Sequence, residues 1–138
     1  TEFIFTLPIA SSNILIVDDN KTDRLLYSKI LKNISPEYNV EVASDGKEAI
    51  QKILSSPPAL VITDHAMPVM NGYEFVIELK KMDIKGKPPV IILSSDIDRA
   101  IINDYTELGI EFVFQKPVNI GSFKLAIEKS LQKGLSGD

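Results

Sequence analysis

The chain alternates between short apolar runs and longer segments with helical periodicity. The apolar runs are only a few residues long and are bounded by polar residues or proline, which is typical of strands buried on both faces of a parallel sheet. We predict strands at residues 14–17, 40–43, 60–63, 90–93 and 112–114. A segment able to form a helix follows each of them. The pattern therefore predicts an α/β fold of consecutive strand–helix units, with helices covering both faces of a parallel sheet.

Two helical segments carry specific signals. Asp45 precedes Glu48 by three residues, which is the spacing of an N-cap residue and its capping-box partner. The helix that begins there should end at the sequence SSPP, because proline cannot continue a helix. The last segment places four apolar residues on one helical face, as a helix packed on a sheet requires: Phe123, Ala126, Ile127 and Leu131.

The composition indicates an ordinary globular protein and excludes several classes. The chain has 138 residues, of which 44% are hydrophobic and 25% are charged. Its net charge of −4 provides no broad basic surface, so we expect no direct nucleic-acid binding. Cysteine is absent, which excludes disulfides and thiolate sites. No segment approaches the roughly 18 apolar residues of a membrane span, and no basic signal-peptide start is present, so we expect a cytoplasmic protein without membrane contact.

The strand–helix pattern also predicts the domain boundaries. We expect an N-terminal extension or linker at residues 1–12, one domain at residues 13–133 and a C-terminal tail at residues 134–138. The first segment, TEFIFTLPIASS, lies outside the pattern. It is compatible with a linker, a non-native addition or an added strand, and these alternatives stay open.

Polar residues follow four of the five predicted strands. Asp18 and Asp19 follow the first strand, Asp64 the third, Ser94 the fourth and Lys116 the fifth. Any one of these residues alone is more simply explained as a helix cap or a solvated side chain. The carboxyl ends of parallel strands, however, meet at one edge of the sheet, which is where ligands bind in open α/β folds. The set as a whole therefore predicts a functional site.

The chemistry of this set suits phosphoryl transfer. Crowded carboxylates require a cation, and an all-oxygen set favours Mg²⁺, with Mn²⁺ as an alternative ion. A carboxylate can attack phosphorus when the phosphoryl charge is neutralised from several sides. Asp64 stands alone after a central strand and is the best nucleophile, while Lys116 and Ser94 could contact phosphoryl oxygens. Because the chain has no Walker loop for a nucleotide, the donor should be another protein or a small molecule.

Four ordered motifs resemble the receiver domain of two-component response regulators. They are ILIVDDN, LVITDHAMPVMNGYEF, VIILSSD and VFQKPV, and the resemblance covers about residues 13–131. It implies a flavodoxin-like doubly wound fold with sheet order 2-1-3-4-5. It also implies that Asp64 is the phosphoacceptor and that Asp18, Asp19 and the backbone carbonyl of Ala66 bind the metal with it. Ser94 and Lys116 match the hydroxyl and lysine residues that contact the phosphoryl group.

The resemblance further implies a signalling domain that only assists its own phosphorylation and dephosphorylation. The expected partners are a histidine kinase or histidine phosphotransfer protein and a downstream output domain or protein. A homodimer is a further possibility, through the face formed by the helix near residues 99–108, the fifth strand and the last helix. Phosphorylation should draw Ser94 toward Asp64 and displace the loop at residues 94–98 and the helix that follows.

Two positions depart from the family pattern. Relatives often carry Tyr or Phe three residues before the lysine, but this chain has Val113 there, between Phe112 and Phe114. An aromatic gate on this strand is therefore not expected. The second position is Ala66, where relatives can carry a side chain that influences water attack, and only Asp96 is a nearby candidate for that role.

Three other interpretations fit the residues less well. Asp96 and Asp98 follow a strand as the nucleophile pair of haloacid dehalogenase-like hydrolases does, although Ala100 does not fit that pattern. A degenerate receiver would act only as a binding module. The sequence DDNKTD lacks the glycine of an EF-hand loop.

Three local features carry further predictions. The ring of His65 should face away from Asp64, because neighbouring side chains alternate along an extended chain. The sequence MPVMNG is expected to form a turn in which Asn71 and Gly72 can adopt positive φ. The bond between Lys116 and Pro117 should be cis, since a tight turn must direct the ammonium group toward the site.

Overall fold

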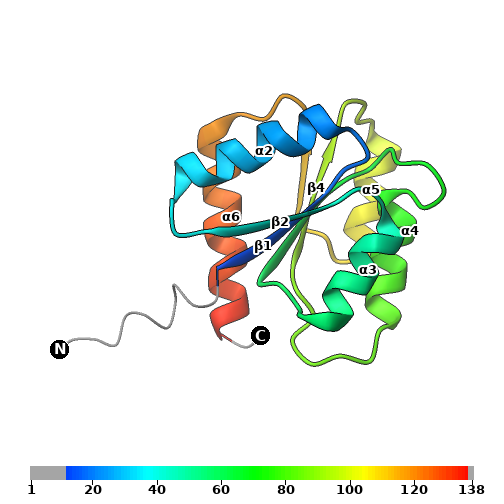
Figure 1. Ribbon diagram of the computed structural model, residues 1–138. Helices are drawn as coiled ribbons and strands as arrows, with labels where there is room; N and C mark the ends of the chain where they lie inside the picture. Colours follow the sequence, from blue (N-terminus) through cyan, green and yellow to red (C-terminus); the bar gives the residue numbers. More distant parts are fainter. Residues whose placement is uncertain (1–11, 137–138) are drawn as a thin grey trace.

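The computed structural model describes residues 12–136, with side chains through residue 132. Its five strands form one parallel sheet in the order β2-β1-β3-β4-β5 (Figure 1). They are β1 (Asn13–Val17), β2 (Asn39–Ala43), β3 (Leu60–Asp64), β4 (Val90–Ser94) and β5 (Phe112–Gln115). Each predicted strand boundary lies within one residue of the observed one. The predicted fold class and sheet order are confirmed.

Helices cover both faces of the sheet. They are α2 (Lys21–Ile34), α3 (Gly46–Ser55), α4 (Gly72–Lys81), α5 (Arg99–Glu107) and α6 (Ile120–Ser136). Figure 1 shows α2 and α6 on one side of the strands and α3, α4 and α5 on the other. The two hydrophobic clusters have the same division. Among residues 12–136, no helix has the length and apolarity needed to cross a membrane.

The packing of β1 explains why its sequence is apolar throughout. Ile14 and Ile16 belong to the cluster under α2 and α6, whereas Leu15 and Val17 belong to the cluster under α3, α4 and α5. All four side chains are buried. Because both faces are covered, alternation of side chains does not produce alternation of polarity. The last helix packs as predicted, with Phe123, Ala126 and Ile127 buried and Leu131 partly buried in the same cluster.

The helix start at Asp45 is only partly as predicted. The Asp45 side chain accepts a hydrogen bond from the Glu48 N–H and caps α3. Glu48, however, accepts from the backbone N–H and hydroxyl of Ser44 and does not close a capping box with Asp45. A complete capping box occurs instead at α4, where the Asn71 and Glu74 side chains bond to each other's backbone N–H.

The loop between β3 and α4 corrects a second prediction. Asn71 has φ −77° and caps α4, and the residue with positive φ is Val69, at 71°. Gly72 is required for space, not for its backbone angles. A Cβ atom there would lie 2.6 Å from the Tyr105 hydroxyl and 2.8 Å from the Asp64 carbonyl oxygen. The backbone of α4 thus passes directly against the end of β3.

The predicted domain boundaries remain predictions. The N-terminal segment lies outside the described residues except for Ser12. At the other end, α6 extends to Ser136, so the predicted tail starts inside this helix.

Candidate functional site

Three carboxylates meet at the carboxyl edge of the sheet. Asp18 and Asp19 follow β1, and Asp64 is the last residue of β3. One oxygen from each lies within 4.8 Å of the others, with Asp18 and Asp64 buried and Asp19 exposed. The Asp18 Oδ1 atom also accepts a hydrogen bond from the Asn20 N–H, at 2.9 Å. The structure therefore brings together the three acids that the sequence placed at this edge.

Lys116 joins this cluster from the loop after β5. Its Nζ atom donates to Asp18 Oδ2 and Asp23 Oδ2, each at 2.8 Å, and lies 3.4 Å from Asp64 Oδ1. The lysine side chain is only 9% exposed. Its backbone N–H donates to the Ser94 carbonyl at 2.8 Å, which ties the loop to β4. The bond to Pro117 is cis, as predicted.

Burial and charge shift two pKa values in the cluster. Burial raises the pKa of Asp64 to about 6, partly opposed by the Lys116 charge and reinforced by Asp18. Burial alone would lower the pKa of Lys116, but hydrogen bonds to Asp18 and Asp23 outweigh it and raise that pKa above its ordinary range. The ammonium group therefore stays charged, while a negative charge on Asp64 is costly without a further cation.

Ser94 lies buried at the end of β4, next to β3 in the sheet. Its hydroxyl donates to the Asp96 carbonyl at 3.0 Å and accepts from the Asp96 N–H at 3.2 Å. These bonds close a tight turn at the start of the loop that leads to α5. Asp98, at the end of this loop, caps α5 by accepting from the Ile101 N–H. Asp98 thus has the structural role of an N-cap.

The ring of His65 bonds to a buried tyrosine of α5. Its Nδ1 atom lies 2.6 Å from the Tyr105 hydroxyl, and the two rings meet edge to face. Tyr105 is fully buried, which raises its pKa above the ordinary range, with a smaller contribution from the Asp64 charge. A side chain of α5 therefore reaches the residue next to Asp64.

Sequence reasoning missed three contributors to this region: Asp23, Arg24 and Tyr105. Asp23 and Arg24 lie in the first turn of α2, where Arg24 Nη1 donates to the Asp18 carbonyl at 2.7 Å. Their position just after the acidic pair could have indicated this, because the first turn of the helix that follows a strand lies at the same edge of the sheet as the end of that strand. For Tyr105 the sequence offers only helical periodicity.

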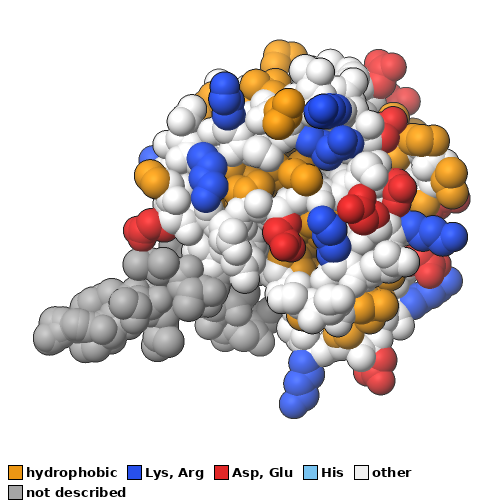
Figure 2. Space-filling view, in the orientation of Figure 1, with side chains coloured by type: hydrophobic (Ala, Val, Ile, Leu, Met, Phe, Trp, Pro, Cys, Tyr) orange, Lys and Arg blue, Asp and Glu red, His pale blue; other side chains and the backbone are white. Residues whose placement is uncertain are grey.

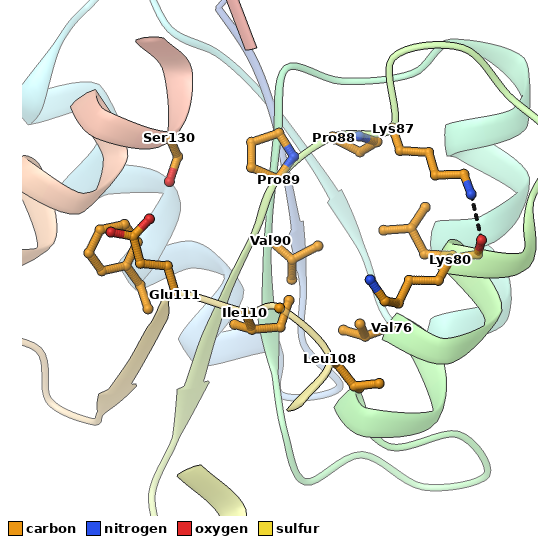
Figure 3. A pocket seen from close by; sticks show the side chains of 13 residues that line it. Val76, Lys80, Lys87, Pro88, Pro89, Val90, Leu108, Ile110, Glu111 and Ser130 are labelled. Atoms are coloured by element: carbon orange, nitrogen blue, oxygen red, sulfur yellow. Dashed lines mark hydrogen bonds between the residues drawn. The ribbon is translucent and has the colours of Figure 1, made fainter. Parts of the chain in front are cut away.

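A hollow lies at the opposite, amino-terminal edge of the sheet (Figure 3). Its volume is about 220 Å³, and most of its wall is apolar, including Val76, Pro89 and Ile110. Lys87 closes part of it by donating to the Lys80 carbonyl. Its acidic component is a single glutamate, Glu111. It therefore lacks the paired carboxylates found at the other edge.

A family model described as the response regulator receiver domain matches residues 14–128. The chain belongs to this family. The receiver domain is 36% identical over 115 residues to a probable chemotaxis protein CheY of Rhizobium etli, covering 83% of this chain and 88% of the relative. It is also 34% identical over 122 residues to histidine kinase P4 of Formosa agariphila, covering 88% of this chain but 9% of that protein.

A solved structure has the same fold. The chemotaxis protein CheY4 of Vibrio cholerae is 27% identical and superposes with a TM-score of 0.77, covering 86% of this chain and 98% of that one. The acidic cluster of this receiver domain also has the donor chemistry that Mg²⁺ prefers, because its ligand atoms are carboxylate oxygens that lie close enough to share one ion.

Proposed function

We propose that this receiver domain accepts a phosphoryl group on Asp64. The observation that carries the proposal is the arrangement of Asp18 and Asp19 beside Asp64, with the Lys116 ammonium 3.4 Å from the Asp64 carboxylate. A nucleophilic carboxylate next to two kinds of positive charge, one from the lysine and one from a metal, is the arrangement that phosphoryl transfer needs.

The proposed metal ligands are Asp18, Asp19, Asp64 and the backbone carbonyl of Ala66. Mg²⁺ bound there would neutralise charge on phosphoryl oxygens, and Mn²⁺ could replace it. Lys116 holds a second positive charge at the same place, and its buried position keeps that charge poorly screened by water. The Ser94 hydroxyl would contact a remaining phosphoryl oxygen once its turn opens.

The proposed reaction is a substitution at phosphorus. An Asp64 carboxylate oxygen forms a bond to phosphorus while the bond from phosphorus to the donor breaks. With a phosphohistidine donor the leaving group is the imidazole nitrogen, and with acetyl phosphate it is acetate. The product is an aspartyl phosphate, which water later hydrolyses to regenerate the carboxylate and release inorganic phosphate. The raised pKa of Asp64 indicates a carboxylate whose charge is poorly solvated, which favours attack on phosphorus once cations are in place.

Labelling with acetyl phosphate tests this function. One phosphoryl group per chain should appear by intact mass spectrometry in the presence of Mg²⁺, and peptide mapping should place it on Asp64. The label should be absent from Asp64→Asn and from samples in excess chelator. Asp83→Asn is the matched control, because it changes an exposed carboxylate in the loop between α4 and β4. Labelling that persists in Asp64→Asn would exclude the assignment, and sustained turnover of a phosphomonoester would favour a hydrolase.

Phosphorylation should change the conformation of the β4–α5 loop and displace α5. Movement of Ser94 toward a phosphoryl group must break its two hydrogen bonds with the Asp96 backbone, so the turn cannot keep its present form. The contact between His65 and Tyr105 offers a second link from the site to α5. Val113 packs in the same cluster as Tyr105 but has no ring that could rotate.

Amide chemical shifts with and without beryllofluoride test this route. The parent should show changes from Ser94 to Leu108, and Ser94→Ala should bind the mimic but lose most of the changes in α5. Val113→Ala is the matched control on β5 and should alter the response only modestly. A parent response that avoids α5, or a normal response in Ser94→Ala, would contradict the proposed route.

The proposed phosphoryl donor is a histidine kinase or phosphotransfer protein that docks beside α2. The first turn of this helix contributes Asp23 to the site, and the next turn exposes Leu25 and Leu26, which are 62% and 46% accessible. Figure 2 shows basic and apolar side chains mixed over this part of the surface. A downstream output domain or protein would bind at α5 and recognise its displacement. The homodimer and the cytoplasmic location stay predictions.

A further inference from the structure

The Lys116 ammonium group is held mainly by two carboxylates other than the phosphoacceptor. It donates to Asp18 and Asp23 at 2.8 Å each, whereas Asp64 lies farther away, at 3.4 Å. An ammonium group has three donors, so two of the three are committed at short distance. A phosphoryl group on Asp64 must therefore compete with existing partners for this lysine.

Asp23 has a position suited to this competition. It lies in the first turn of α2, and its backbone N–H donates to the Asn20 side chain at 3.0 Å. Its side chain is 31% exposed, while that of Lys116 is 9% exposed, so the ion pair lies at the mouth of the site and not on the open surface. Asp18 has a second role as a proposed metal ligand, but no such role is assigned to Asp23.

A simpler explanation for Asp23 is helix stabilisation. A carboxylate in the first turn interacts favourably with the helix dipole, and this would hold whether or not Lys116 were nearby. That explanation predicts an effect on stability alone. It does not explain why the carboxylate oxygen lies at hydrogen-bonding distance from Lys116, which also approaches Asp64.

We propose that Asp23 is a positioning residue that restrains Lys116 on the α2 side of the site and thereby weakens binding of the phosphoryl group. This inference rests on the proposed function. Asp23 acts through two effects of the same sign. It competes with the phosphoryl oxygens for the ammonium donors, and its negative charge repels the incoming anion. The same charge attracts a cation, so Asp23 strengthens metal binding.

Removal of the Asp23 charge should therefore shift anion and cation affinity in opposite directions. The anion probe is beryllofluoride at saturating Mg²⁺, and the cation probe is Mg²⁺ alone, both followed by amide chemical shifts. Asp23→Asn should tighten beryllofluoride binding by about two- to fivefold, the range expected of a partly exposed ion pair. It should weaken Mg²⁺ binding by about two- to fivefold.

Three further variants define the test. Asp23→Glu keeps the charge within reach of Lys116 and should stay within about twofold of the parent for both probes. Asp83→Asn makes the same charge change in the exposed loop between α4 and β4 and should change neither affinity. Asp23→Ala is a second neutral variant, chosen because alanine is the best helix former, and it should behave as Asp23→Asn does even if that variant folds poorly.

The outcomes separate this inference from the proposed function. If the parent fails to bind beryllofluoride, the phosphoacceptor function fails and the inference fails with it. If the parent binds it but the neutral Asp23 variants match Asp83→Asn, or bind it more weakly than the parent does, the positioning role is wrong while the function stands. A change in thermal stability without a change in either affinity would assign Asp23 to helix stabilisation only.

Discussion

The charge of Asp64 should destabilise the metal-free fold. Burial raises the pKa of this carboxyl from 3.8 to about 6, so the folded environment disfavours its ionised form. The substitution Asp64→Asn removes the charge and nearly preserves the shape of the side chain. Lys116 keeps its hydrogen bonds to Asp18 and Asp23 in this variant, so no buried cation is left without a partner. We expect Asp64→Asn to be more stable than the parent at neutral pH without metal.

The raised pKa sets both the size and the pH dependence of this effect. Between pH 3.8 and about 6, the folded protein holds a proton on Asp64 that the unfolded chain has lost. The contribution of Asp64 to the unfolding free energy of the parent therefore falls as pH rises through this interval and levels off above it. The shift from 3.8 to about 6 corresponds to about 3 kcal/mol. The gain from Asp64→Asn should thus be near zero at about pH 3 and reach about 3 kcal/mol above about pH 7.

Urea unfolding followed by circular dichroism, in chelating buffers across this pH range, measures the difference. Asp83→Asn is the matched control, because it removes one exposed carboxylate far from the site. Saturating Mg²⁺ should stabilise the parent more than Asp64→Asn, since an ion that binds only the folded state adds to its stability. The difference in unfolding free energy between the two proteins should therefore become smaller. A gain that is equal at all pH values, or a loss of stability above about pH 7, would refute the buried-charge argument.

Three further predictions concern the loop and helices around the site. Val69→Gly should raise the unfolding free energy by about 1 kcal/mol in urea titrations, because Val69 is 96% exposed and its φ of 71° is strained for valine. Val69→Ala should raise it by less. Tyr105→Phe should lower the unfolding free energy by about 1–2 kcal/mol and shift the ring resonances of His65, because it removes the hydrogen bond between the two side chains. Tyr73→Phe should leave those resonances in place. Gly72→Ala should cost about 1–3 kcal/mol, measured in the same titrations, because its Cβ would press on Tyr105 and the Asp64 backbone.

The fold and the acidic cluster could be predicted because their signals are local. A strand buried on both faces must be apolar throughout, as β1 and β3 are, and such a strand can end in a carboxylate only where the sheet meets solvent or a cation. Parallel topology then places all strand ends at one edge. Asp18, Asp64 and Lys116 could be assigned to one site on this basis, without any knowledge of side-chain geometry.

The remaining features depend on packing that periodicity does not encode. The sequence MPVMNG indicates a turn, but the choice of Val69 over Asn71 or Gly72 for positive φ depends on contacts of the whole loop. Asn71 is used to cap α4, and Gly72 must leave room for Tyr105. These two requirements set the backbone at the end of the loop, and the left-handed residue falls at the exposed Val69. A residue pattern alone could not rank these competing demands.

Tyr105 changes how the missing aromatic residue on β5 should be understood. The sequence predicted no gate because Val113 has no ring, and Val113 does lie in the cluster under α3, α4 and α5. A buried aromatic ring is nevertheless present in that cluster, but α5 supplies it. Its hydroxyl bonds to the residue that follows Asp64 and lies against the start of α4. An aromatic ring on β5 could respond to a change at the site only by rotating. Tyr105 is part of α5, so a shift of the contact at its hydroxyl acts directly on that helix. The hydrogen bond between His65 and Tyr105 therefore links the site directly to α5, as a response that displaces this helix requires.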